Sequence, residues 1–235
     1  MPALGLGLPT MKRIVVAELL DTVPATPAQI TVALADLRTI NRWFGGVGAT
    51  QSMIVQVAEK LGASSLSLLE VAAGAGYVPQ AVSKSLRARG IRLEVTLLDR
   101  AHAHLKNSNG NGTSAVAGDA LALPFADGSV DLVSCCLFTH HLEPEEVVQF
   151  VNEGLRVCRA AVIINDLIRD PIHLALAYAS LPLYRSRFTY HDAPASVRRA
   201  YTMAQMRAML QQSKAAKVQI DRCPFFRMAA IAWKR

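Results

Sequence analysis

The chain has 235 residues, of which 51% are hydrophobic and 18% are charged, and its net charge is +7. This length suits one large domain, and this share of hydrophobic residues predicts a packed core and excludes a disordered chain. No hydrophobic run approaches the roughly 20 residues of a membrane-spanning helix, and the N-terminal stretch is too short and too acidic for a secretory signal. The four cysteines lack metal-site spacing and suit a reducing compartment, so we expect a cytoplasmic protein.

Helical patterns fill the first quarter of the chain. Hydrophobic residues recur at helical spacing over residues 28–43 and 50–61, and glycines follow each run. We expect residues 1–62 to form an N-terminal helical cap and residues 63–235 to form an α/β domain.

From residue 66 onward, short hydrophobic runs alternate with helical patterns. The predicted strands cover residues 66–71, 92–98, 114–117, 130–137, 161–164, 217–223 and 227–234. The predicted helices cover residues 78–89, 144–158 and 202–212, and the polar run 107–112 predicts a surface loop. This alternation predicts a doubly wound, mostly parallel sheet whose last strand pair can include an antiparallel member.

Residues 171–200 are too long for an ordinary connection between a strand and a helix. Long insertions of this kind often cover a binding site, so we expect a helical substrate lid here. Tyr184 and His191 within it are candidate substrate contacts. Asp192 follows His191 directly, and an alternative role for this acid is to cap a helix.

The most informative stretch runs from residue 68 to residue 76, where a hydrophobic strand ends in an acid and small residues follow. Small residues let a ligand approach the backbone, and the next helix offers free N–H groups at its start. Glu70 has little structural reason to sit there, because burial of an unpaired acid is costly. The next strand ends in Asp99, about 20 residues past the glycines, where βαβ nucleotide sites bind ribose hydroxyls.

These motifs in this order resemble the class I methyltransferases that use S-adenosylmethionine (SAM). The resemblance covers about residues 65–167 and rests on Asp99, on Gly118-Asp119-Ala120 and on the Leu-Pro-Phe-x-Asp-x-Ser-x-Asp pattern of residues 123–131. It implies a Rossmann-like, seven-stranded sheet with SAM as the cofactor. Asn165-Asp166-Leu167 and the run 196–200 are similar to bacterial small-molecule methyltransferases of polyketide and phenolic-lipid pathways.

The resemblance also implies roles for single residues. Glu70 would bind the methionine amino end, and the backbone of Ala72, Gly74 and Gly76 would cradle the cofactor. The family usually has glycine at the position of Ala72, so its methyl group would crowd the cofactor if the backbone there has a positive φ.

The other end of the cofactor would meet residues after the second, third and fourth strands. Asp99, with Arg100 beside it, would hold the ribose hydroxyls. Asp119 would accept a hydrogen bond from the adenine amino group, with Ala120 next to the ring, and Leu137 would flank the cofactor. An Asx turn is an alternative role for Asp119.

Acceptor chemistry is expected at the same edge of the sheet. His140 and His141 follow the fourth strand, and histidine can take a proton from a hydroxyl group at neutral pH, so either is a candidate base or substrate orienter. The alternative is that both are ordinary loop residues. Asn165 and Asp166 end the fifth strand and are candidates to hold a substrate hydroxyl or amine. No group of acids matches a magnesium site, so the sequence predicts no metal.

The sequence therefore predicts an enzyme of secondary metabolism that methylates a small hydroxylated acceptor of aromatic or polyketide type, on oxygen first and on carbon next. One alternative is a non-catalytic protein that binds SAM or a related nucleotide. Another is an NAD(P)-dependent oxidoreductase, although the chain has no Tyr-x-x-x-Lys proton donor.

Charge is uneven along the chain, because residues 156–235 hold 14 basic and 4 acidic residues, a net of +10. A solvated basic face and peripheral contact with a membrane both fit this charge. No RNA-binding signature accompanies it, so we expect no nucleic-acid partner. Monomer and homodimer both remain open.

Overall fold

The computed structural model describes residues 11–101, 105 and 113–235, so the predicted loop at 107–112 lies outside the described residues. Within that part of the chain, the strands form one seven-stranded sheet in the order β3-β2-β1-β4-β5-β7-β6. The strands are β1 (Ser65–Val71), β2 (Arg92–Asp99), β3 (Ser114–Ala117), β4 (Val130–Cys136), β5 (Cys158–Leu167), β6 (Lys217–Cys223) and β7 (Arg227–Trp233). All neighbours are parallel except β7, which is antiparallel to both β5 and β6. The predicted doubly wound sheet with an antiparallel last pair is confirmed.

The described residues form eight α-helices and two short 3-10 turns. They are α1 (Leu19–Thr22), α2 (Pro27–Trp43), α3 (Gly46–Leu61), α4 (Tyr77–Arg87), α6 (Pro144–Val157), α7 (Pro171–Ala179), α8 (Arg187–Arg199) and α9 (Met203–Gln211), with 3-10 turns η1 (Thr139–His141) and η2 (Leu181–Leu183). Thr202 caps α9 as predicted, because its Oγ1 accepts a hydrogen bond from the backbone N–H of Gln205 at 3.2 Å. Gly45 ends the turn after α2 with a φ of 83°, which suits glycine.

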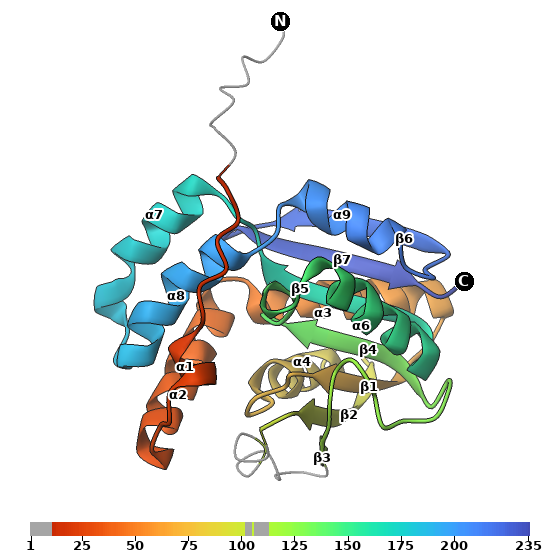
Figure 1. Cartoon of the computed structure of the whole chain (residues 1–235). Helices are drawn as coiled ribbons and strands as arrows, with labels where there is room; N and C mark the ends of the chain where they lie inside the picture. The colour runs from red at the N-terminus through yellow and green to blue at the C-terminus, as the bar shows by residue number, and fades with distance from the viewer. Residues whose placement is uncertain (1–10, 102–104, 106–112) are drawn as a thin grey trace, which may run out of the picture.

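Helices cover both faces of the sheet, with α3 and α4 on one face and α6 and α9 on the other (Figure 1). Along the central strands, successive side chains point to opposite faces of the sheet. Leu68, Leu132 and Ile163 pack towards α3 and α4, while their neighbours Leu69, Val133 and Ile164 pack in the other core. Both sets are fully buried, as expected of strands in a parallel sheet.

Helix α3 belongs to the sheet layers, although the sequence placed it in the N-terminal cap. Its buried face, with Met53, Ile54 and Val57, lies in the same core as Leu66 of β1 and Ile231 of β7. A helix with a hydrophobic stripe buries that stripe well by packing on a sheet. Helix α3 therefore packs on the sheet, although it precedes the first strand in the sequence.

The remaining helices, α1, α2, α7 and α8, stand together at one end of the sheet (Figure 1). Two buried carboxylates join the N-terminal segment to the insertion at 171–200. Asp192 of α8 accepts hydrogen bonds from the backbone N–H groups of Leu19 at 2.7 Å and Leu20 at 3.1 Å. Asp36 of α2 accepts one from the N–H of Ser186 at 2.8 Å.

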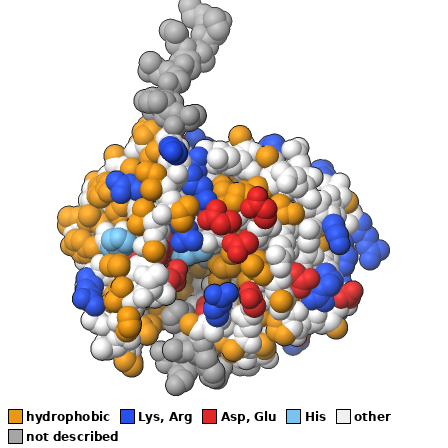
Figure 2. All heavy atoms as spheres, in the orientation of Figure 1, with side chains coloured by type: hydrophobic (Ala, Val, Ile, Leu, Met, Phe, Trp, Pro, Cys, Tyr) orange, Lys and Arg blue, Asp and Glu red, His pale blue; other side chains and the backbone are white. Residues whose placement is uncertain are grey.

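The outer surface of this helical group is hydrophobic in part (Figure 2). Ile172 and Tyr178 of α7, which do not line the large cleft, are 50% and 44% exposed. Across the described ranges, no helix combines the length and the apolar composition that crossing a membrane requires.

Candidate active site

A cleft of about 1230 Å³ lies between the helical group and the carboxyl ends of β1, β2 and β4. Ligands of doubly wound sheets bind at the carboxyl ends of the strands, next to the point where the strand order reverses. Here that point lies between β1 and β4. Most of the predicted cofactor residues line the cleft, namely Glu70, Ala72, Gly74, Asp99, Arg100, Asp119, Ala120 and Leu137. Gly76 does not.

The turn after β1 has an unusual backbone. Ala72, Gly74 and Gly76 have φ values of 53°, 54° and 71°. Gly76 precedes α4, and a Cβ atom there would lie 2.5 Å from Cδ1 of Leu97, so this glycine is required by packing rather than by the cleft. Ala72 adopts a conformation that favours glycine, which is the condition under which its methyl group crowds a ligand.

The carboxylate of Asp99 is hydrogen-bonded to the backbone of this turn. Its Oδ2 accepts a hydrogen bond from Gly74 N at 2.8 Å, and its Oδ1 accepts one from Ala101 N at 2.8 Å. These backbone donors fix the carboxylate at the end of β2, where it lines the cleft.

Asp119 lies farther along the same wall and is half exposed. Its Oδ1 accepts a hydrogen bond from Leu121 N at 3.0 Å, which is an Asx turn. Its Oδ2 lies 3.6 Å from Nη2 of Arg100. The Asx turn does not remove Asp119 from the cleft wall, so both predicted roles of this residue remain compatible with its position.

Glu70 is the buried acid of the cleft, with 2% of its surface exposed. Burial raises the pKa of Glu70 to about 7, against the effect of the Ser134 hydroxyl, which donates a hydrogen bond to its Oε2. Among the described residues, no basic side chain forms an ion pair with it. A cationic group of a ligand would supply the missing charge, so this carboxyl fits the amino end of an amino-acid-like cofactor.

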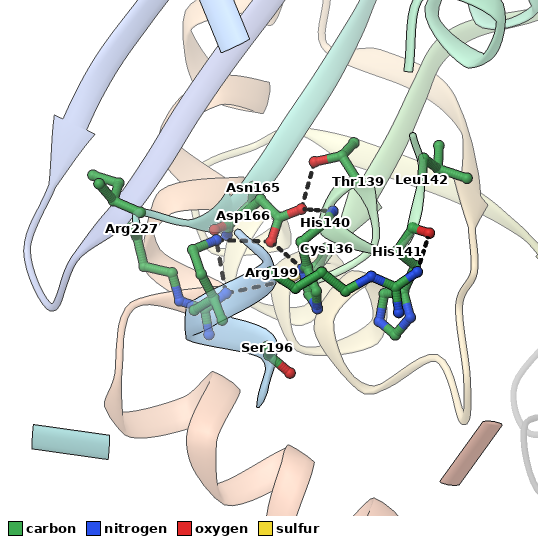
Figure 3. Close-up of polar contacts among 12 residues, drawn as sticks. Cys136, Thr139, His140, His141, Leu142, Asn165, Asp166, Ser196, Arg199 and Arg227 are labelled. Carbon is green, nitrogen blue, oxygen red and sulfur yellow. Dashed lines mark hydrogen bonds and ion pairs between the residues drawn. The ribbon is translucent and has the colours of Figure 1, made fainter. Parts of the chain in front are cut away.

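The histidine pair lies on η1, directly after β4 (Figure 3). His140 is buried, and its Nδ1 lies 2.7 Å from Oδ1 of Asp166. Oδ2 of Asp166 accepts hydrogen bonds from the backbone N–H of His140 at 3.0 Å and from the hydroxyl of Thr139. Burial opposes a charged imidazole, but the carboxylates of Asp166 and Glu18 raise the pKa of His140 to about 10. The two carboxylates therefore favour positive charge at this position.

Glu18, a residue that the sequence did not single out, reaches this pair from the segment before α1. Its Oε1 lies 3.4 Å from Nε2 of His140 and 3.6 Å from Nε2 of His141. Nδ1 of His141 lies 3.0 Å from Oδ2 of Asp21. Glu18, His140 and His141 all line the cleft. No local pattern connects Glu18 to the histidines, because Asp192 on α8 positions this segment.

Two candidate substrate residues lie behind the cleft wall. Asn165 is fully buried, and its Nδ2 donates hydrogen bonds to Gly46 O at 2.7 Å and to Thr50 Oγ1 at 3.0 Å. Asp166 is equally buried against Thr139 and His140. Neither lines the cleft. The sheet edge was predicted correctly, but packing against α3 and η1 turns both side chains inward.

The two predicted substrate contacts of the insertion lie in different places. Tyr184 lines the cleft, and its hydroxyl lies 3.0 Å from Oγ of Ser180. His191 is 40% exposed on its side chain, lies 2.9 Å from Asp192 and faces a separate small pocket. His191 therefore does not share the cleft with the other candidates.

Arg227 is a further cleft residue that the sequence did not reveal, and only 1% of its surface is exposed. Its Nε donates to Phe44 O at 3.0 Å and its Nη2 to Asn41 Oδ1 at 3.1 Å. These bonds tie the end of α2 to β7. An arginine after a turn of two phenylalanines gives no local signal of burial.

Part of the chain matches a known protein family. Residues 69–164 match the model of a family described as methyltransferase domain. This range covers the turn after β1, Asp99, Asp119 and the histidine pair. No curated protein sequence matches the chain.

Solved structures share the fold. A SAM-dependent methyltransferase from Aquifex aeolicus is 16% identical with a TM-score of 0.58, and the match covers 90% of this chain and 100% of that one. The plantazolicin methyltransferase BpumL in complex with S-adenosylhomocysteine (SAH) is 13% identical with a TM-score of 0.67, covering 92% and 93%. The magnesium protoporphyrin IX methyltransferase of Synechocystis PCC 6803 with bound SAH is 15% identical with a TM-score of 0.50, covering 77% and 80%. At these identities the solved structures show a shared fold, and the family match covers the strands and turns that border the cleft.

Proposed function

We propose that this protein transfers a methyl group from SAM to a hydroxyl group of a small, largely apolar acceptor. The main support for the proposal is that residues suited to bind a cofactor and residues suited to activate an acceptor line the same cleft. Glu70 and Asp99 on one wall suit a cofactor, and the Glu18, His140 and His141 cluster on the same cleft suits acceptor activation.

Each candidate cofactor residue contacts a different part of the cofactor. Glu70 binds the amino end through its buried carboxyl, and Asp99 holds the ribose hydroxyls. Asp119 and Ala120 lie next to the base, with Arg100 at the rim and Leu137 against the cofactor. Ala72 and Gly74 supply the backbone wall. SAM when bound supplies a methyl group on a positively charged sulfur, so the protein needs to align the acceptor and manage its proton.

The roof of the cleft supports an apolar acceptor. Leu176, Leu183 and Tyr184 border the cleft from the insertion, and Phe188 lies beside them. Leu176 and Leu183 are also 53% and 68% exposed, so a bound acceptor would cover them. This lining favours an aromatic or polyketide-like molecule of secondary metabolism, and residues 171–200 then act as its lid.

The histidine cluster acts on the acceptor hydroxyl. His141 has 23% of its side chain exposed and is the more accessible of the pair. Asp166 and Thr139 act through His140 as positioning residues, since neither borders the cleft. All four cysteines are free, which supports a reducing, cytoplasmic setting.

One observation favours a second function. The positive φ of Ala72 places a methyl group where the methyltransferase pattern has glycine, and a narrowed cradle suits a protein that binds SAM or a related nucleotide without turnover.

Transfer of a labelled methyl group separates the two functions. The purified protein is incubated with methyl-labelled SAM and a panel of phenols, enols and aliphatic alcohols, and a His141→Ala variant is run beside it. The proposal expects a labelled ether product that the variant makes far more slowly. SAH binding without any labelled product across the panel supports the non-catalytic function.

A further inference from the structure

The three side chains of the cluster direct their ligand atoms to one point. Oε1 of Glu18, Nε2 of His140 and Nε2 of His141 all lie within 4.8 Å of one another. Glu18 precedes α1, whereas both histidines belong to η1, so the tertiary fold creates this convergence.

The spacing suits ligands of a common ion better than hydrogen bonds. The Glu18 oxygen lies 3.4 Å and 3.6 Å from the two imidazole nitrogens, longer than the usual 2.7–3.2 Å of an N–H···O bond. Two ligand atoms of a tetrahedral zinc site, each about 2.0–2.2 Å from the ion, lie roughly 3.3–3.6 Å apart. The observed separations fall in this range.

The outer contacts also match a metal site. Nδ1 of His140 lies 2.7 Å from Asp166, and Nδ1 of His141 lies 3.0 Å from Asp21. Histidines that bind a metal commonly donate their other N–H to a carboxylate, which orients the ring and makes the ligand nitrogen more basic. Oε1 of Glu18 in turn accepts a hydrogen bond from the hydroxyl of Ser196 on α8. Each of the three ligand groups is therefore held by a second residue.

We propose that Glu18, His140 and His141 bind one divalent transition-metal ion, with Zn²⁺ as the first candidate. Two imidazoles and one carboxylate suit zinc and its neighbours in the first transition series, whereas Mg²⁺ prefers oxygen ligands. Three protein ligands leave a coordination position for water or substrate, as in catalytic zinc sites.

The position of the ion gives it a role in acceptor activation, and this role rests on the proposed function. All three ligands line the cleft, so the ion borders the acceptor. A metal ion lowers the pKa of a hydroxyl group that it contacts, which would favour phenols and related acidic hydroxyl compounds as acceptors. The metal site itself does not depend on methyl transfer.

Metal titration tests the site. The full chain, free of any histidine tag and stripped with a chelator, is titrated with Zn²⁺ by calorimetry and with Co²⁺ by visible absorption. Glu18→Gln and His141→Gln each remove a ligand that is not fully buried. The matched control is Glu94→Gln, the same carboxylate-to-amide change at an exposed residue of β2 outside the cluster. SAH binding and thermal unfolding are measured for every variant, so loss of the fold and failure of the proposed function are detected separately.

We expect one Zn²⁺ per chain, an intense four-coordinate Co²⁺ spectrum, and no competition from Mg²⁺. The two ligand variants should bind Zn²⁺ about tenfold or more weakly, with the Glu94 variant unchanged. Wild-type protein that binds no Zn²⁺ or Co²⁺ overturns the proposal, as does binding that the two ligand variants leave intact. Either result would leave the cluster as a buried imidazolium held between carboxylates.

Discussion

Ser134 on β4 donates a hydrogen bond from its hydroxyl to the carboxyl of Glu70 on β1, across a parallel pairing that sets these two residues side by side. Both are buried in the sheet at the cleft edge. A carboxyl with one neutral partner in this setting remains protonated to a higher pH than usual, which makes Glu70 a measurable reporter of the site.

The first prediction concerns stability and pH. The pKa of Glu70 rises from 4.5 to about 7 on folding, so the folded state holds the proton more tightly. Its contribution to the free energy of unfolding is therefore present at low pH and declines as pH rises from 4.5 to 7, by about 3 kcal/mol. Urea unfolding at pH 5 and pH 8 should show that Glu70→Gln loses less stability than wild type over this interval. An equal loss in both proteins would contradict the assignment.

The second prediction concerns Ala72. Its positive φ costs an alanine roughly 1–2 kcal/mol, and the extra backbone freedom of glycine in the unfolded state offsets about half of that. Ala72→Gly should therefore raise the free energy of unfolding by up to about 1 kcal/mol and tighten SAH binding. Ala73→Gly is the control, because Ala73 is not among the residues of positive φ. Weaker SAH binding by Ala72→Gly would show that the methyl group does not crowd the ligand.

The third prediction concerns Arg227. Arg227→Met roughly keeps the volume but removes the donors to the Phe44 carbonyl and to Asn165 Oδ1, and it leaves Asn41 Oδ1 with the Cys136 thiol alone. Buried acceptors without partners cost about 1–3 kcal/mol each, so we expect a loss of at least about 2 kcal/mol in urea unfolding. Arg222→Met, at a side chain that is 56% exposed, is the control and should change stability little. Equal effects of the two substitutions would argue against the link between α2 and β7.

The fourth prediction concerns the tie between α1 and α8. Asp192→Ala removes the acceptor for the N–H groups of Leu19 and Leu20. Hydrogen exchange at these two amides should accelerate, because their protection depends on this carboxylate. Asp36→Ala, which releases Ser186 instead, should leave the amides of Leu19 and Leu20 close to their wild-type rates. Unchanged exchange in Asp192→Ala would contradict this account of how Glu18 is positioned.

The sheet was predictable because each strand carries a local signal. Hydrophobic runs such as 92–98 predicted strands such as β2, and the glycine turn predicted one wall of the cleft. Helix α3 was predicted to begin at residue 50 but begins at Gly46, because Gly45 adopts a left-handed conformation and lets the helix start early.

The wall of the cleft around His140 was less predictable because distant residues form it. Hydrogen bonds from Asp192 and Ser196 of α8 bring Glu18 to His140, and no periodicity encodes such contacts. Asn165 and Asp166 were placed at the correct edge of the sheet. Whether their side chains face the cleft depends on α3 and η1, which pack over them.

The central claim is that the cleft binds SAM through Asp99, and calorimetric titration with SAH tests it most directly. Wild-type protein should bind one SAH per chain, Asp99→Ala should lose most of the affinity, and Asp127→Ala, at an exposed acid outside the cleft, should bind as wild type. A folded wild type that binds NAD(P) but not SAH, or equal SAH binding by Asp99→Ala, would contradict the account.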